Sequence, residues 1–182
     1  MGEALAAGRQ LTGFAGVFSS TCSFVLERIS GGMTAEAAVD AARKAGLTEG
    51  DASADLSGWD TAVKAAIHAE TFWPGLGLTP ADFVRQPLDA SIEEQVSDAA
   101  ARGRVWRYAA VCRPAAGEYR VGPVCFSPDH PLGEGKTGGK ALVLETESLG
   151  NLLCKSSGCE HATAGTLLAD LWTAARLVKN RR

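Results

Sequence analysis

The stretch Val105-Trp106-Arg107-Tyr108-Ala109-Ala110-Val111 marks a change in the pattern of apolar residues along the chain. Between about Ser20 and Gly103 the apolar residues repeat with the helical period. From Val105 onward they alternate and are rich in β-branched and aromatic types, which is typical of strands. A second such run, Tyr119–Phe126, follows a turn over residues 114–117 that contains proline and glycine. The chain therefore changes from helices to strands at this point.

The remaining elements extend outward from this stretch. Toward the N-terminus we expect a strand over residues 11–19 and helices beginning at Thr21 or Ser20, Thr34, Ser57, Thr79 and Ser91. Toward the C-terminus we expect strands over 141–146 and 152–154 and a closing helix over 162–178. This order predicts an α+β fold, with helices packed on one face of a mostly antiparallel sheet. Residues 1–182 are expected to form a single domain.

The composition is that of an ordinary globular protein, since 46% of the 182 residues are hydrophobic and 21% are charged. A net charge of −3 gives no electrostatic reason to expect nucleic acid or an anionic membrane as a partner. No apolar run approaches the roughly 20 residues that span a bilayer, and the first residues lack the layout of a secretory signal. Five cysteines, an odd number, predict reduced thiols in a cytoplasmic protein.

The segment from Gly46 to Lys64 carries the clearest candidate chemistry. Glu49 follows a helix end, and Asp60 and Lys64 are four residues apart on the next predicted helix, so they share one face. A carboxylate and an ammonium group on one face can act together as acid and base on a substrate. The neighbours of Lys64 are apolar, and a lysine that is kept from water gives up its proton more readily.

Two ordinary explanations compete with this one. Asp60 is the third residue after Ser57, so it could satisfy free backbone N–H groups at the start of the helix. Asp60 and Lys64 could also form a plain surface ion pair, which contributes only about 0.3–0.5 kcal/mol. The positions of Asp60 and Lys64 alone favour these structural explanations. The surrounding sequence is needed to distinguish them from a catalytic role.

The surrounding sequence resembles the catalytic domain of homoserine dehydrogenase over nearly the whole chain, from about Leu11 to Val178. The motifs that carry the resemblance are Ser-Thr-x-Ser-Phe at 20–24, Gly-x-Thr-Glu at 46–49, Asp-x-x-x-Lys at 60–64, Gly-Leu-Thr-Pro at 77–80, His-Pro-Leu at 130–132 and Thr-Ala-Gly-x-x-x-Ala-Asp at 163–170. The resemblance implies that Glu49 holds the amino group of the substrate and that Asp60 and Lys64 serve hydride transfer. It also implies substrate contacts from Thr21 and Asp55, and a homodimer.

Departures from the family surround the expected pocket. Ser20 replaces a glycine, His68 stands at a position that is usually apolar, and residues 155–161 replace a glycine-rich loop with a bulky polar one. Ser20, His68, Cys159 and His161 are therefore possible pocket residues. Cys154, Cys159 and His161 match no common zinc spacing, so we expect no metal.

The sequence also argues against a nicotinamide site within this chain. No glycine-rich motif opens a helix after a first strand, as dinucleotide binding requires. The glycines at 133, 135, 138 and 139 invite comparison with a phosphate loop, but they lead into a predicted strand. We therefore expect no cofactor in this chain, and NAD(P) only if a partner domain supplies its site.

Three hypotheses about function remain. The first, which the sequence favours narrowly, is a stand-alone enzyme that uses Lys64 and Asp60 for acid–base chemistry on a small amino-acid-like substrate, in a cyclisation, isomerisation, elimination or hydrolysis. The alternative is the catalytic domain of an NAD(P)-dependent homoserine dehydrogenase whose dinucleotide domain lies on another chain or has been removed. The third is a non-catalytic dimerisation or binding module.

Overall fold

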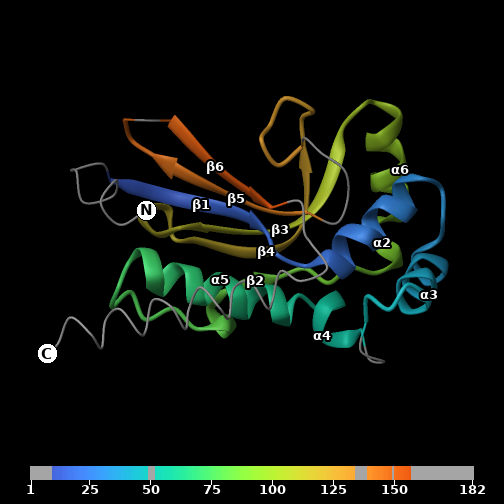
Figure 1. Cartoon of the computed structure of the whole chain (residues 1–182), viewed down its shortest axis with the longest axis horizontal. Coiled ribbons are helices and arrows are strands. Elements are labelled where there is room, and N and C mark those ends of the chain that lie inside the picture. Colours follow the sequence, from blue (N-terminus) through green and yellow to red (C-terminus); the bar gives the residue numbers. More distant parts are fainter. Residues whose placement is uncertain (1–9, 49–51, 134–138, 149, 157–182) are drawn as a thin grey trace, which may run out of the picture.

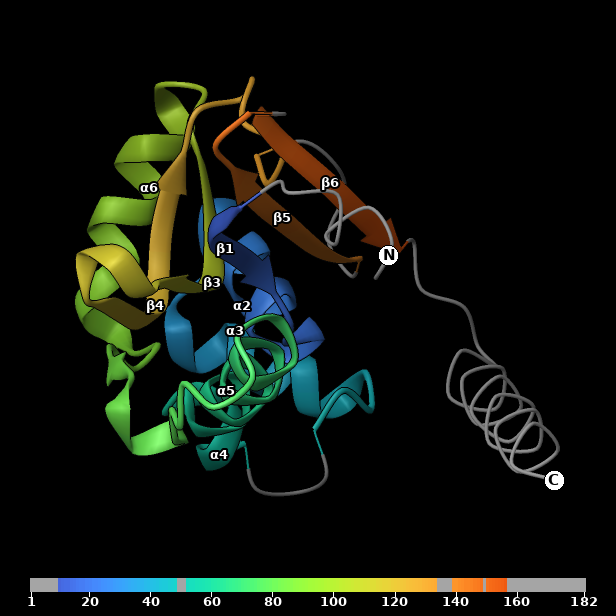
Figure 2. The same cartoon turned by 90° about the vertical axis from the view of Figure 1, so that its left-hand side faces the viewer.

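The computed structural model describes residues 10–48, 52–133, 139–148 and 150–156. These residues form a six-stranded sheet with helices packed on one face (Figure 1, Figure 2). The strand order is β2-β4-β3-β1-β5-β6. The strands are β1 (Leu11–Val17), β2 (Val84–Arg85), β3 (Val105–Arg113), β4 (Glu118–Phe126), β5 (Lys140–Thr146) and β6 (Gly150–Ser156). The predicted α+β class is confirmed.

Pairing in the sheet is antiparallel except at one edge, where β2 runs parallel to β4. β1 lies between β3 and β5, so the first strand of the described residues joins two parts of the sheet that are distant in sequence. β2 was not predicted. It is only two residues long, and both Val84 and Arg85 are exposed, so its sequence shows no apolar pattern.

The helices are α2 (Ser20–Ser30), α3 (Ala35–Lys44), α4 (Ser53–Leu56), α5 (Trp59–Phe72) and α6 (Glu93–Ala101), with 3₁₀ turns at Pro80–Asp82, Ala90–Ile92 and Pro114–Ala116. The N-cap of α2 is Ser19, whose hydroxyl accepts from the Cys22 N–H, so the prediction of Thr21 or Ser20 as the cap is wrong by one or two residues. Thr34 caps α3 as predicted, accepting from the Ala37 N–H.

The helix predicted from Ser57 to about Phe72 corresponds to α5, which begins at Trp59, and the short helix α4 before it was not predicted. Gly58 has φ 78°, a left-handed conformation that glycine adopts without strain, and it is the N-cap of α5. Ser57 is the C-cap of α4, where its hydroxyl donates to the carbonyl of Ala54, and it makes no capping hydrogen bond at the start of α5. The capping interpretation of Ser57 and Asp60 is therefore wrong.

The main core lies between the sheet and the helices. Phe14 of β1 and Tyr108 of β3 are completely buried there, against apolar residues of α2 and an alanine-rich face of α5. Alanine lets a helix backbone approach the sheet closely. A smaller cluster on the opposite face joins Ala15, Val111 and Val143 with Leu132. The predicted closing helix over residues 162–178 lies outside the described residues.

Candidate active site

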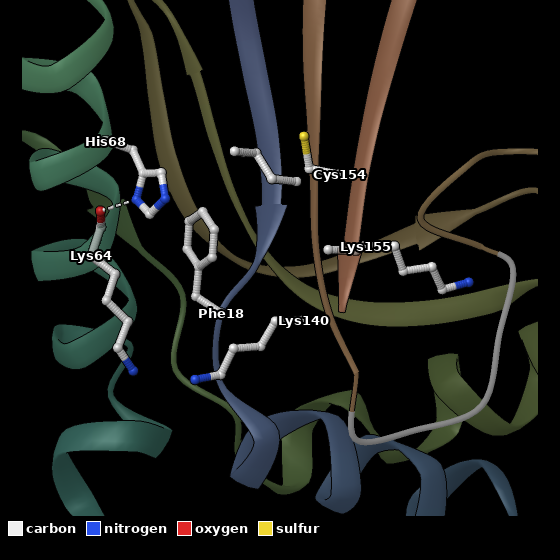
Figure 3. Close-up of a pocket in the computed structure, with 8 residues that line it drawn as sticks. Phe18, Lys64, His68, Lys140, Cys154 and Lys155 are labelled. Carbon is white, nitrogen blue, oxygen red and sulfur yellow. Dashed lines mark hydrogen bonds between the residues drawn. The ribbon is translucent and has the colours of Figure 1, made fainter. Parts of the chain in front are cut away.

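A pocket of about 380 Å³ opens at the end of β1, between α5 and the strands β5 and β6 (Figure 3). Phe18, which directly follows β1, forms part of its wall. The described residues that line it are Phe18, Lys64, His68, Lys140, Ala141, Leu142, Cys154 and Lys155. An apolar wall with a few polar groups directed into it is the usual form of a small-molecule site.

Asp60 and Lys64 form the ion pair that their spacing predicts. The Lys64 Nζ atom lies 2.5 Å from a carboxylate oxygen of Asp60. Their side chains keep 38% and 36% of their surface exposed, respectively. The flanking Ala62, Ala65 and Ala66 are buried, but Lys64 itself is not, so the prediction that its ammonium group is kept from water is wrong. A bound ligand would have to exclude water from the Lys64 ammonium group.

The start of α5 holds this pair in place. Gly58 packs so closely under Tyr108 that a Cβ atom at Gly58 would lie 2.4 Å from the Tyr108 hydroxyl oxygen. Tyr108 in turn donates to the carbonyl of Gln86 at 2.9 Å. Asp60 lies in the first turn of α5, two residues beyond Gly58. The contact between α5 and β3 therefore fixes where the carboxylate and its lysine partner stand.

His68 lies one turn beyond Lys64 and contributes to the pocket wall. Its Nδ1 atom donates to the Lys64 carbonyl oxygen at 2.7 Å, as Figure 3 shows. Its ring stacks on Phe18 with the centroids 4.6 Å apart and the planes 12° from parallel. These contacts orient the ring against the wall and leave Nε2 as its other polar atom.

Thr21 and Asp55 have structural partners near the pair. The buried Thr21 hydroxyl donates to the Leu47 carbonyl at 2.8 Å, which ties α2 to the end of the segment after α3. Asp55 accepts from the Ser19 hydroxyl at 3.2 Å. Ser20 is half-buried in the first turn of α2. A direct substrate contact from Thr21 or Asp55 stays a prediction.

Cys22 sits among these groups as a buried thiol. Burial raises its pKa to about 12, and the negative charges of Asp55 and Asp60 act in the same direction, whereas the Ser19 hydrogen bond and Lys64 oppose them. The thiol donates to the Asp55 carbonyl at 3.3 Å. Its burial and its raised pKa favour the protonated thiol at neutral pH.

Three of the predicted site residues, Glu49, Cys159 and His161, lie outside the described residues. Within the described ranges, no group of three or more His, Cys, Asp and Glu residues is placed to hold a metal ion. Lys140 was missed from the sequence, because a lysine before a predicted strand looks like an ordinary solvent-facing residue. The structure brings it to the pocket from β5.

A family model described as homoserine dehydrogenase matches residues 1–172 of the chain. The chain belongs to the homoserine dehydrogenase family. It is 31% identical over 169 residues to an NAD(+)-dependent homoserine dehydrogenase of Pseudomonas canavaninivorans, covering 91% of this chain and 48% of that protein. It is 30% identical over 190 residues to a homoserine dehydrogenase of Mycobacterium leprae, covering 93% of this chain and 40% of the relative.

The solved structures agree on the fold of this family member. A crystal structure of a homoserine dehydrogenase from Thiobacillus denitrificans superimposes with a TM-score of 0.87 over 98% of this chain and 42% of that one, at 22% identity. The chain thus spans about half the length, or less, of these relatives. Among the described residues, no helix is both long and apolar enough to cross a membrane.

Proposed function

We propose that this chain forms the substrate-binding and catalytic part of a homoserine dehydrogenase, which interconverts homoserine and aspartate semialdehyde. The observation that carries the proposal is the Asp60–Lys64 pair beside a pocket, in a chain that belongs to this family. The likeness to named dehydrogenases favours this alternative over the stand-alone enzyme that the sequence favoured narrowly. The stand-alone reaction and the binding module stay predictions without further support.

In the proposed reaction, Lys64 moves the proton of the substrate oxygen. In the reducing direction its ammonium group donates a proton to the aldehyde oxygen, and in the oxidising direction the neutral amine accepts the hydroxyl proton. Asp60 is 2.5 Å from Nζ and positions it. Phe18 and His68 would exclude water from one side of the substrate. Glu49 would hold the substrate amino group, as the resemblance implies.

The nicotinamide of NAD(P), when bound, would supply or accept the hydride. A dinucleotide site places glycines where a strand turns into a helix, so that helical N–H groups face the phosphates. Here the glycines at 138 and 139 are followed directly by strand β5, which begins at Lys140. This arrangement does not fit a pyrophosphate site. We propose that polypeptide outside the described residues holds the cofactor.

The assembly and compartment form part of the same proposal. We expect a homodimer, as the family resemblance implies, with a small amino-acid-like substrate as the ligand. We expect the cytoplasm as its location, because the buried thiols of Cys22 and Cys112 are free and suit a reducing compartment.

A complementation experiment tests the proposed function. The 182-residue chain would be produced together with the remaining, cofactor-binding part of the Pseudomonas relative, and NAD(P)⁺ reduction would be followed on addition of homoserine. The proposal expects turnover by the mixture and none by either part alone. Tight NADH or NADPH binding by this chain alone, or no homoserine-dependent reduction by a mixture shown to form a complex, would contradict it.

A further inference from the structure

The pocket contains a second lysine that the proposed reaction does not use. Lys140 is the first residue of β5, and its strand neighbour Leu142 packs against the main core. Side chains alternate along a strand, so Lys140 and Leu142 face the same side of the sheet, toward the helices. Lys140 therefore reaches the pocket from the sheet, whereas Lys64 reaches it from α5.

Lys155 lines the same pocket but points the other way. It pairs with Ala141 across β5 and β6, so its side chain belongs to the face opposite to that of Lys140. Figure 3 shows the same relationship: Lys64 and Lys140 extend toward a common opening, and Lys155 extends away from it. Two of the three lysines around the pocket thus converge.

The convergence of two ammonium groups calls for a negative charge between them. No Asp or Glu is among the described lining residues, and no carboxylate in the described parts of the chain pairs with Lys140. The chain as a whole carries a net charge of −3, so this local positive charge is not a general property of the surface. Within the described residues, the ion pair of Asp60 is with Lys64.

We propose that Lys64 and Lys140 together bind one oxyanion group, a carboxylate or a phosphate, of a small ligand. Charged hydrogen bonds from two ammonium groups favour an oxyanion strongly over a neutral group. The carbon part of the ligand would lie against Phe18 and Leu142. The ammonium group of Lys64 has three N–H donors, so it can contact this oxyanion as well as Asp60 and the reacting oxygen. The inference rests on the proposed function only in assigning this oxyanion group to the substrate; the anion site follows from the pocket itself.

Binding measurements without any cofactor test the site. The 182-residue chain would be titrated with inorganic phosphate and with acetate at low salt, by calorimetry or NMR. Lys140→Gln is expected to weaken binding of the preferred anion about tenfold or more, and Lys140→Arg, which keeps the charge, by less than about threefold. Lys155→Gln removes the same charge from the neighbouring strand and is the matched control, with an expected change below about twofold.

The two probes distinguish the sources of the oxyanion. Tighter phosphate binding indicates a phosphorylated ligand, and acetate binding that is equal or tighter indicates a carboxylate. Failure of both anions to bind, or equal weakening by Lys140→Gln and Lys155→Gln, overturns the proposal. If the anions bind as expected but the complemented enzyme does not turn over homoserine, the proposed function is wrong and the anion site is still supported.

A measurement on the unmodified sequence keeps the test independent of folding defects. Amine-selective labelling followed by mass spectrometry reports how accessible each lysine is. The bound anion is expected to slow labelling of Lys64 and Lys140 together, while Lys44, at the end of α3 and outside the pocket, is unaffected. Equal labelling of Lys140 with and without saturating anion would overturn the assignment.

Discussion

The hydroxyl of Tyr108 occupies the space above Gly58 that a side chain would need. An ideal Cβ atom at Gly58 would lie 2.4 Å from that oxygen and 3.1 Å from Val121, while the glycine itself has φ 78°. This contact joins the sheet to the turn that starts the helix of Asp60 and Lys64. The position of the proposed catalytic pair thus depends on a residue without a side chain.

Gly58→Ala is therefore expected to lower the free energy of unfolding by roughly 2–4 kcal/mol, because it combines a left-handed backbone with a clash against a buried ring. Gly103→Ala is the matched control, since Gly103 has φ 69° but nothing within 4 Å of its Cβ position. It should cost only about 1 kcal/mol. Urea denaturation measures both, and equal losses would contradict the packing argument.

An ion network crosses the sheet and predicts a pH dependence. Arg113 of β3 contacts Glu118 of β4 at 2.6 Å and Glu145 of β5 at 2.7 Å, and Arg120 also contacts Glu118 at 2.7 Å. Hydrogen bonds from Arg120 first and Arg113 second hold the pKa of Glu118 below its usual value. The folded state therefore favours the ionised carboxylate.

The lowered pKa of Glu118 makes the folded protein lose stability in acid. Glu118 contributes its stabilisation fully at neutral pH, above its unfolded pKa, and the contribution is lost as the pH falls through the unfolded and then the lower folded value. Melting temperatures between pH 7 and pH 3 should fall less steeply for Glu118→Gln than for the wild type. Glu36→Gln, on the exposed side of α3, should follow the wild-type curve. Parallel curves for Glu118→Gln and the wild type would contradict the assignment.

The thiols are expected to separate into two reactivity classes. Burial raises the pKa of Cys22 to about 12 and that of Cys112 to about 11, whereas Cys154 is exposed beside the pocket. At pH 8 a maleimide should label Cys154 within minutes and leave Cys22 and Cys112 unlabelled until the protein is denatured. Peptide mapping by mass spectrometry gives the result for each cysteine. If Cys22 were labelled as fast as Cys154, the thiol of Cys22 beside Asp55 and Asp60 would be open to water, contrary to this prediction.

Much of the fold could be predicted, because long periodic elements carry their own signal. The strands over 105–113 and 118–126 and the helix capped by Thr34 follow from apolar pattern and cap chemistry. The short helix α4 and the cap of α5 could not, since Ser57 looks like the N-cap of the helix, whereas Gly58 takes that position because of its close contact with Tyr108. β2 exists through its pairing with β4 rather than through its own residues.

The part of the candidate site that lies on a single helix, α5, was predictable from the sequence. Asp60 and Lys64 meet because of their spacing, and the family motifs single them out. The exposure of Lys64 was not predictable, because the apolar neighbours that suggested burial belong to other faces of α5. Lys140 depends on how β5 pairs with β1 and β6, which a local sequence pattern does not contain.

The proton-transfer role of Lys64 is tested by kcat of the complemented enzyme with homoserine. Lys64→Ala is expected to lower kcat by about 10²–10⁴-fold, since it removes the proton-transfer group, and to change the free energy of unfolding by less than about 0.5 kcal/mol. Asp40→Asn, which breaks the surface pair with Arg43, is the control and should leave kcat unchanged. A Lys64→Ala enzyme that keeps the wild-type kcat would show that Lys64 does not transfer the proton.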